Sequence, residues 1–191
     1  MSLAPITKKD FKKKRDVSEN VYMTNLLTRK IYLPFKYIGK NIIQNLERKL
    51  KSQLEGKCSI EGYIKPDSIK IISYSSGLMQ EENIVFEVAF ECNVCCPVEG
   101  MLIKCNVKNI TQAGIRAVLP GDISPVIIYV SKDHHLNNKN FSNLKEDEEI
   151  IIRVIGQRYE LNDKNVSVIG ELVNEKKIEK TKKKPKLIIK D

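Results

Sequence analysis

The stretch Val98–Ser131 constrains the fold more than any other part of the chain, because apolar and polar residues alternate through three short segments of it. A period of two is typical of half-buried β-strands, and short polar turns separate the segments. Three consecutive strands of this length predict a small antiparallel barrel. The apolar members are Ile103, Cys105 and Val107, then Ile115, Ala117 and Leu119, then Val126, Ile128 and Val130.

Two further segments complete this barrel. IIRVIGQRYEL and VSVIGEL flank Asn162–Asn165, whose residue types favour a hairpin turn. The polar stretch 132–149, which contains His134 and His135, fits a long loop in which both histidines are solvated. Five short strands with one long insertion are typical of an all-β five-stranded OB barrel. We therefore predict an OB-fold RNA-binding domain over residues 98–173.

The preceding residues predict an α+β domain over 21–97, with one helix on an antiparallel sheet. Residues 21–33 are rich in β-formers, which predicts a strand that Pro34 stops. An apolar residue then recurs every four positions from Ile38 to Leu54, which predicts a helix over that range. After Gly56 the period returns to two, and strands are expected at 58–64, 68–75 and 83–92.

The net charge of +9 lies in the two ends of the chain. Residues 1–16 hold six basic and two acidic residues, and 174–191 hold eight basic and three acidic ones, so the rest is neutral. We expect a disordered basic arm over 1–20 and a disordered basic tail over 174–191. No apolar run suggests a signal peptide or a membrane span, and five cysteines without a secretory signal indicate an intracellular protein with free thiols.

No set of residues predicts catalysis, a cofactor or a metal. Cys92-x-x-Cys95-Cys96 resembles half of a zinc site, but no second CxxC supplies the other half. On one extended strand Cys92 and Cys95 point to opposite faces, so buried structural thiols are the simpler interpretation. No serine elbow, phosphate loop or paired carboxylates accompany the two histidines.

The polar positions of the barrel strands predict an outer surface with Lys104, Lys108, Arg116 and Tyr129. Guanidinium and phenol planes stack on unpaired bases while lysines meet phosphate, so this surface suits single-stranded RNA. The alternative is that any half-buried strand carries such residues on its wet side.

Several residues also resemble a known family. Gly100, Val107-x-x-Ile110 and Gly114 followed by Ile115–Val118 are similar to the ribosomal S-one-type OB module. The order of elements along about 21–172 resembles the stalk component of multisubunit DNA-directed RNA polymerases, known as the seventh subunit in eukaryotic polymerase II and as E-prime in archaea. The further elements are Leu33-Pro34, Gly39, Leu54–Cys58, Gly62–Ile64, Phe86–Phe90, Pro97, Ile155–Arg158 and Ile169–Leu172.

The resemblance implies a tip domain that docks on the polymerase core, an OB barrel that meets nascent RNA, and no active site in the subunit itself. It also implies a heterodimer with the stalk's other subunit, of the fourth-subunit or archaeal F type. Arg158 joins the expected RNA-binding residues. The expected docking residues are Leu33, Pro34, Phe35, Gly39, Gly62 and Tyr63.

The chain departs from the family in several places. Arg116 stands where such modules often carry an aromatic residue, Tyr129 where they carry histidine or phenylalanine, and Met101 where the family has an acidic residue. Abundant Lys, Ile and Asn, with the two basic ends, suggest a homologue from a large DNA virus. The expected location is the nucleus for a cellular protein, and the host cytoplasm or the virion for a viral one. The alternative function is a free-standing OB-fold RNA-binding protein, such as a translation factor.

Overall fold

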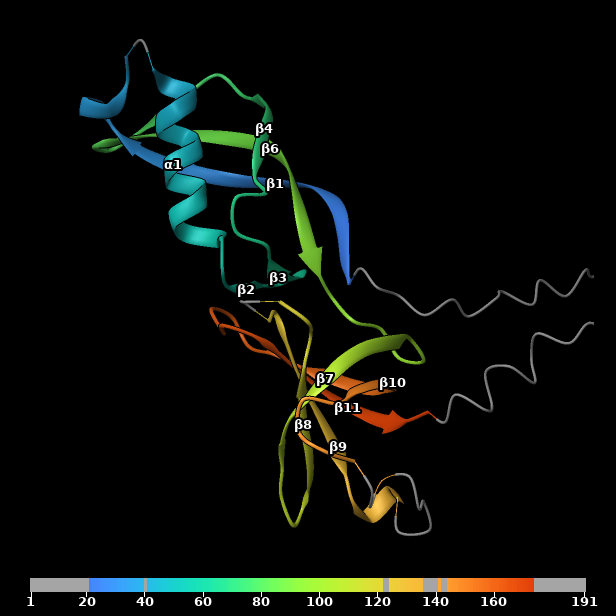
Figure 1. Cartoon of the computed structure of the whole chain (residues 1–191). Coiled ribbons are helices and arrows are strands. Elements are labelled where there is room, and N and C mark those ends of the chain that lie inside the picture. The colour runs from blue at the N-terminus through green and yellow to red at the C-terminus, as the bar shows by residue number, and fades with distance from the viewer. Residues whose placement is uncertain (1–20, 40, 122–123, 136–140, 142–143, 174–191) are drawn as a thin grey trace, which may run out of the picture.

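The computed structural model describes residues 21–39, 41–121, 124–135, 141 and 144–173. The molecule is elongated, with a helix and a six-stranded sheet at one end and a closed five-stranded barrel at the other (Figure 1). The predicted fold class is thereby confirmed. The basic arm and tail expected at the two ends of the chain lie outside the described residues. No helix in the described part of the chain is long and apolar enough to cross a membrane.

Strand β6 is the central strand of the sheet. Strand β1 pairs antiparallel with it over thirteen consecutive residue pairs without a register shift, and β5, β4 and β3 follow one another along its other edge. Antiparallel pairing needs no long crossover, and the strands from β2 to β6 follow one another through short connections. The strands are β1 (Tyr22–Pro34), β2 (Cys58–Ser59), β3 (Gly62–Ile64), β4 (Lys70–Tyr74), β5 (Leu78–Gln80) and β6 (Asn83–Cys95).

The helix α1 spans Ile42–Leu54, so the predicted start at Ile38 is wrong. Phe35–Tyr37 form a separate 3-10 turn, η1, and Ile38 then adopts an extended conformation that interrupts the helical backbone. Leu46 and Leu50 are completely buried against the sheet, and each such burial stabilises the fold by about 1.5–3 kcal/mol. The rest of this core comes mainly from alternate residues of β6: Phe86, Val88, Phe90, Cys92 and Val94.

The predicted strand 58–64 is also wrong in detail, because it is two short strands joined by a turn. Gly62 ends that turn with φ +130, a conformation that residues with a side chain rarely adopt. Strand β5 was not predicted at all.

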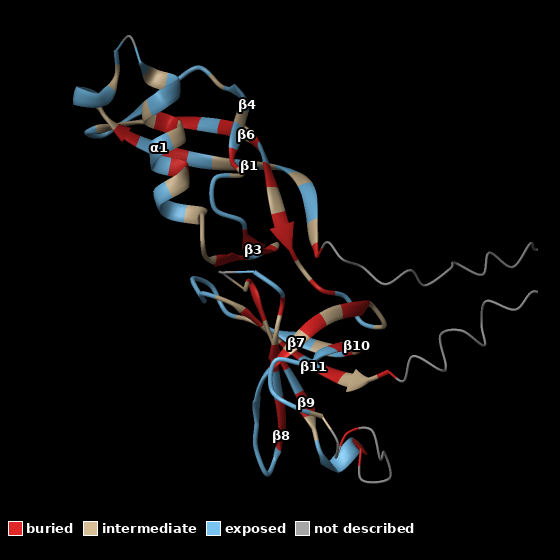
Figure 2. Ribbon diagram, viewed as in Figure 1, coloured by how far each residue is buried: buried red, intermediate tan, exposed pale blue. Residues whose placement is uncertain are grey.

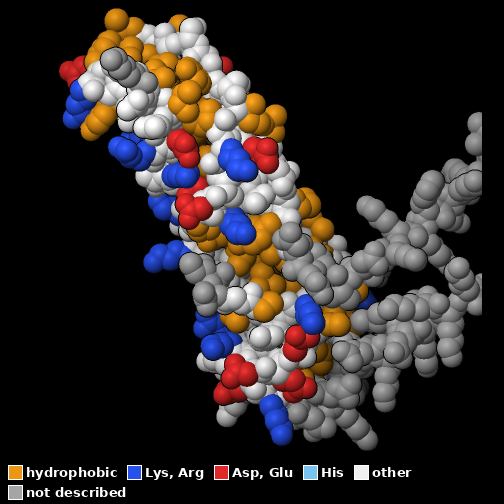
Figure 3. Space-filling model, turned by 45° about the horizontal axis from the view of Figure 1, so that its top comes forward, with side chains coloured by type: hydrophobic (Ala, Val, Ile, Leu, Met, Phe, Trp, Pro, Cys, Tyr) orange, Lys and Arg blue, Asp and Glu red, His pale blue; other side chains and the backbone are white. Residues whose placement is uncertain are grey.

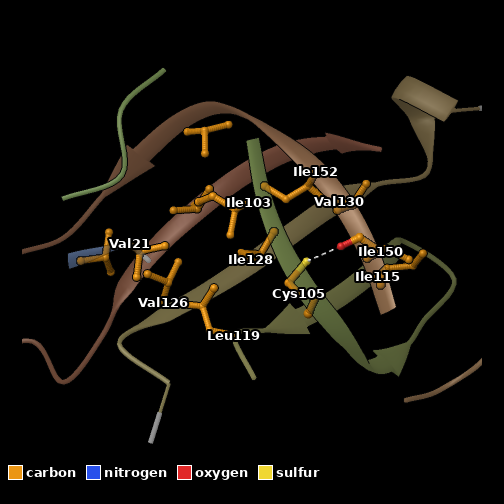
Figure 4. Close-up of a cluster of buried hydrophobic side chains, with 14 of the residues drawn as sticks. Val21, Ile103, Cys105, Ile115, Leu119, Val126, Ile128, Val130, Ile150 and Ile152 are labelled. Carbon is orange, nitrogen blue, oxygen red and sulfur yellow. Dashed lines mark hydrogen bonds between the residues drawn. The ribbon is translucent and has the colours of Figure 1, made fainter. Parts of the chain in front are cut away.

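The barrel contains β7 (Leu102–Ile110), β8 (Gly114–Val118), β9 (Val126–Ser131), β10 (Glu149–Arg158) and β11 (Val166–Leu172). Its strand order is β7-β8-β9-β11-β10, closed by pairing of β10 with β7, and β9 and β11 run parallel. The alternating residues predicted to be apolar and inward are buried, and they fill the interior (Figure 4). The Cys105 thiol lies in this core and donates to the Ile150 carbonyl at 3.7 Å.

The sheet and the barrel share buried residues where they meet. Val21, Cys58, Tyr63 and Cys95 belong to the same hydrophobic cluster as the barrel interior, and burial continues through the junction (Figure 2). The barrel's β10–β11 hairpin also bonds to β2: the Cys58 N–H donates to Asp163 O at 2.8 Å, and the Asn162 N–H donates to Cys58 O at 2.9 Å. The division into domains at residue 97 stays a prediction.

Candidate RNA-binding face and docking surface

Arg116 and Tyr129 lie directly opposite each other on neighbouring strands. Arg116 of β8 is paired with Tyr129 of β9 in the antiparallel register, and both side chains are exposed on the outside of the barrel. Side chains of a directly opposed pair have Cβ atoms about 4.5–5.5 Å apart. Two side chains that can each stack on an unpaired base, a guanidinium and a phenol, therefore occupy neighbouring positions on the outside of the barrel.

Ile169 lies beside Tyr129 on the same outer surface, a position that the sequence around it did not predict. It is paired with Tyr129 across the parallel β9–β11 ladder and is 53% exposed. An exposed isoleucine beside an exposed tyrosine offers a contact surface to the faces of unpaired bases. We call Arg116, Tyr129 and Ile169 the barrel row.

The four predicted residues of this face are not equivalent. Lys108 is the extra residue of a β-bulge between Val107 and Asn109, and because Asn109 pairs with Arg116, the bulge places Lys108 next to the barrel row. Lys104 lies four positions earlier on β7 and forms an ion pair with Glu149 at 2.6 Å. The structure therefore brings Lys108, Arg116 and Tyr129 together and leaves Lys104 apart.

Arg158 is also separated from the barrel row. It lies on β10 opposite Ser167, two positions along β11 from Ile169, and its guanidinium pairs with Glu160 at 3.1 Å. Its side chain is 84% exposed, so this pairing contributes little to stability. Its predicted role in RNA binding stays a prediction.

Gly114 fixes the start of β8 and hence the position of Arg116. A Cβ at this glycine would lie 2.2 Å from the carbonyl oxygen of Val130, and its φ is +155. Only a residue without a side chain lets β8 approach β9 this closely.

The predicted docking residues fall at two separate places. Leu33, Pro34, Phe35 and Gly39 lie at the end of the sheet far from the barrel, where Leu33 is buried and Phe35 is exposed. Gly62 and Tyr63 lie at the junction with the barrel. Tyr63 is only 2% exposed and packs in the shared core, so its side chain is not available to a partner. That any of these residues meets a polymerase stays a prediction.

The far end of the sheet carries a cluster of exposed apolar side chains, which we call the distal patch. The sheet register places Tyr32 with Leu78 across Val85 on the face away from α1, and Leu33 with Met79 across Ile84 on the face that packs against α1. The exposed side chains therefore surround the end of the sheet on both faces. Hydrophobic side chains gather at this end in Figure 3. The patch consists of Tyr32, Phe35, Tyr37, Ile43, Leu78 and Met79, of which Met79 is 75% exposed and Leu78 70%.

A polar cluster holds β1 against the β2–β3 turn. The Arg29 guanidinium donates to both carboxylate oxygens of Glu61 at 2.6 Å, and the Ser59 hydroxyl donates to the same carboxylate at 2.9 Å. Burial opposes ionisation of Glu61, but the bonds from Arg29 and Ser59 outweigh it and lower the pKa of the carboxyl. Arg29 and Ser59 also line a cavity of about 140 Å³ between α1, β2 and the β10–β11 hairpin.

The cysteines and histidines are part of the packing. Cys92 lies in the core under the helix and Cys95 in the core shared with the barrel, on opposite faces of β6 as expected. No three His, Cys, Asp or Glu side chains within the described ranges are grouped to hold a metal. His134 is exposed, but His135 is buried, so the expectation that both histidines are solvated is wrong for His135.

Comparison with known proteins points to one kind of protein. A mimivirus protein (Acanthamoeba polyphaga mimivirus) named as a putative DNA-directed RNA polymerase subunit is 26% identical over 172 residues, covering 80% of this chain and 82% of its own. The DNA-directed RNA polymerase II subunit RPB7 of Glycine max is 25% identical over 154 residues, covering 72% and 85%. The chain is similar to RNA polymerase subunits of the RPB7 kind.

Subunit 7 of Arabidopsis thaliana RNA polymerase II is 28% identical over 109 residues, or 56% of this chain and 60% of its own. No family model matches the chain. The expected resemblance to RPB7-like subunits is confirmed, and a viral protein is among the similar proteins. These matches span both the sheet and the barrel, because 72–80% of the chain cannot be aligned within either one alone.

Proposed function

We propose that the protein is a non-catalytic stalk subunit of a DNA-directed RNA polymerase, which docks on the core enzyme and contacts nascent RNA during transcription. The observation that carries the proposal is homology to RNA polymerase subunits over most of the chain. Two exposed surfaces at opposite ends of an elongated molecule support it: the distal patch on the sheet and the barrel row.

The distal patch is the docking surface. Clustered exposed apolar side chains mark sites of protein association, and six of them here include three aromatic residues and a methionine. Burying one such side chain in a partner contributes about 1.5–3 kcal/mol. Leu33 is buried beside Met79, and Pro34 directly precedes the 3-10 turn that begins with Phe35.

The barrel row is the RNA-contacting surface, with Lys108 beside it for phosphate. The body of the protein is electrically neutral, so its attraction for RNA is modest. A weak RNA contact suits a subunit that is held at the polymerase by its other end. The elongated shape separates the two surfaces, so both can be occupied at once.

We also propose that the protein forms a heterodimer with a stalk subunit of the fourth-subunit or F type. It would act where that polymerase transcribes, which is the nucleus for a cellular protein and the host cytoplasm or the virion for a viral one. These points rest on the resemblance of the chain to the family.

Docking is tested by two matched variants of the full chain. Met79→Asp places a charge in the distal patch at a side chain that is 75% exposed, while Leu26→Asp makes the same change at a 66% exposed position in the middle of β1. We expect Met79→Asp to lower recovery of the large polymerase subunits in affinity purification about tenfold or more, because it removes one apolar contact and buries a charge.

Leu26→Asp should retain wild-type recovery. Equal recovery with both variants would show that the distal patch is not the docking surface. If the wild-type protein binds RNA but brings down no polymerase subunit, the free-standing RNA-binding protein becomes the better interpretation.

A further inference from the structure

The turn between β10 and β11 reaches out of the barrel and bonds to the last strand of the sheet (Figure 1). Strand β2 lies at one end of the strand order, and β3 occupies only one of its two edges. On its other side the Cys58 N–H donates to Asp163 O at 2.8 Å, and the Asn162 N–H donates to Cys58 O at 2.9 Å. The Tyr159 hydroxyl also donates to Ile60 O at 3.0 Å. The barrel therefore occupies the backbone groups that an edge strand would otherwise leave open.

This turn is held in shape by its own hydrogen bonds. The Asp163 N–H donates to Glu160 O at 3.2 Å, and the Glu160 N–H donates to Asp163 Oδ2 at 2.8 Å. Asn162 has φ +69, in the left-handed region that asparagine enters more readily than most residues with a side chain. The backbone of residues 162 and 163 is thus presented to β2 in one orientation. We call residues 159–163 the junction clip.

The strand that receives the junction clip is fixed to both long strands of the sheet. Tyr63 of β3 pairs with Cys58 of β2 on one side and with Cys95 of β6 on the other. The β2–β3 turn is held to β1 as well, because both carboxylate oxygens of Glu61 accept from the Arg29 guanidinium. A bond made to β2 is therefore a bond made to the whole sheet.

The chain itself provides a second attachment between the sheet and the barrel. Residues 96–101 connect β6 to β7, and this connection is bonded to β10: the Gly100 N–H donates to Val154 O at 2.8 Å. The Gln157 amide also donates to the Cys96 sulfur at 3.3 Å. The buried cluster shared by the sheet and the barrel packs at the same junction. Rotation about the connecting segment would break the junction clip and expose this cluster.

We propose that the junction clip locks the sheet and the barrel into one rigid body, and that Asn162 is the residue that sets it. Parts of a chain joined by one segment usually move relative to each other unless their interface is large and hydrophobic. Here the backbone bonds to Cys58 add to the shared core and remove that freedom.

The rigid body has a consequence that rests on the proposed function. The distal patch and the barrel row lie at opposite ends of the elongated molecule. With the junction clip closed, their relative orientation is fixed. A polymerase that holds the sheet then also sets the direction in which Tyr129 and Arg116 face.

The test uses the isolated full chain without RNA or polymerase, so its outcome does not depend on the proposed function. Residual dipolar couplings of the backbone N–H groups, measured by NMR in a weakly aligning medium, report how each strand is oriented in a common frame. In the wild type, we expect the couplings from β1 and β6 and those from the five barrel strands to fit a single alignment tensor.

Two variants at the same position separate the junction clip from the shared core. Asn162→Pro removes the N–H that bonds to Cys58, and proline cannot adopt φ +69. Asn162→Gly keeps both the N–H and the conformation and is the matched control. We expect Asn162→Pro to need different tensors for the sheet and the barrel and to lower the hydrogen-exchange protection of the Cys58 amide about tenfold or more. Asn162→Gly should keep one tensor and the protection of the wild type.

Different tensors for the sheet and the barrel in the wild type would overturn the proposal. A single tensor in Asn162→Pro would also overturn it, because the shared core alone would then hold the two parts together. If Asn162→Pro does not fold, exchange of the Cys58 amide in the wild type decides. Protection comparable with that of the Val107 amide, which donates to Glu148 O at 2.9 Å within the barrel, supports the junction clip, and exchange at the rate of an unbonded amide contradicts it.

Discussion

Truncation of Tyr129 is the sharpest perturbation of the proposed RNA-binding face. The residue is 44% exposed, is paired with Arg116 on β8 and is paired on its other side with Ile169 on β11. Removing an aromatic side chain on which a base stacks costs about 1–3 kcal/mol, which is roughly a five- to 150-fold increase in Kd. We expect Tyr129→Ala to weaken binding of single-stranded RNA within this range without unfolding the barrel.

The assay is fluorescence anisotropy with a labelled single-stranded RNA, on the purified full chain. Tyr74→Ala is the matched control, because Tyr74 is 40% exposed on β4 of the sheet, outside the barrel. Arg116→Ala should fall in the same range, and the double variant tests whether the two neighbours act on one base. Binding by Tyr129→Ala within twofold of the wild type, or an equal loss in Tyr74→Ala, would refute the assignment of this face.

Three further outcomes follow from the packing. Gly114→Ala should lower the free energy of unfolding, measured in urea, by about 2 kcal/mol or more, because its Cβ would lie 2.2 Å from the Val130 carbonyl oxygen. Gly156→Ala should lower it much less, because a Cβ there would have nothing within 4 Å. Leu50→Ala should cost about 2–5 kcal/mol in the same experiment, and the half-exposed Ile43→Ala clearly less. Burial raises the pKa of the Cys105 and Cys95 thiols to about 12 and that of the Cys58 and Cys92 thiols to about 11, so these four form thiolates only in strong alkali. Alkylation of the native protein near neutral pH, followed by mass spectrometry, should therefore label the partly exposed Cys96 first. Equal labelling of all five cysteines would contradict this packing.

Local alternation was enough to predict the barrel. Residues such as Ile103 and Ile128 repeat with a period of two, and that period depends on neighbours in the sequence alone. The same argument placed Lys108, Arg116 and Tyr129 on one face. The order of strands along the chain, together with the resemblance of several short motifs, led to the RPB7-like subunits that the comparisons also found.

Features that depend on distant partners were not predictable. Ile169 joined the barrel row only because β11 pairs in parallel with β9, forty residues away in the sequence. His135 lies in a polar stretch that suggests a solvated loop, and its burial depends on Leu172 and Phe141. Leu78 and Met79 were missed because three residues of β5 are too few to show a period, although they supply the most exposed part of the distal patch.

The most direct test of the polymerase-subunit assignment is affinity purification of the tagged full chain from its native source, followed by mass spectrometry of the proteins that accompany it. The assignment predicts recovery of the large DNA-directed RNA polymerase subunits in amounts comparable with the tagged chain, and their loss when Met79→Asp is purified in the same way. Recovery of the tagged chain without any large polymerase subunit would contradict it.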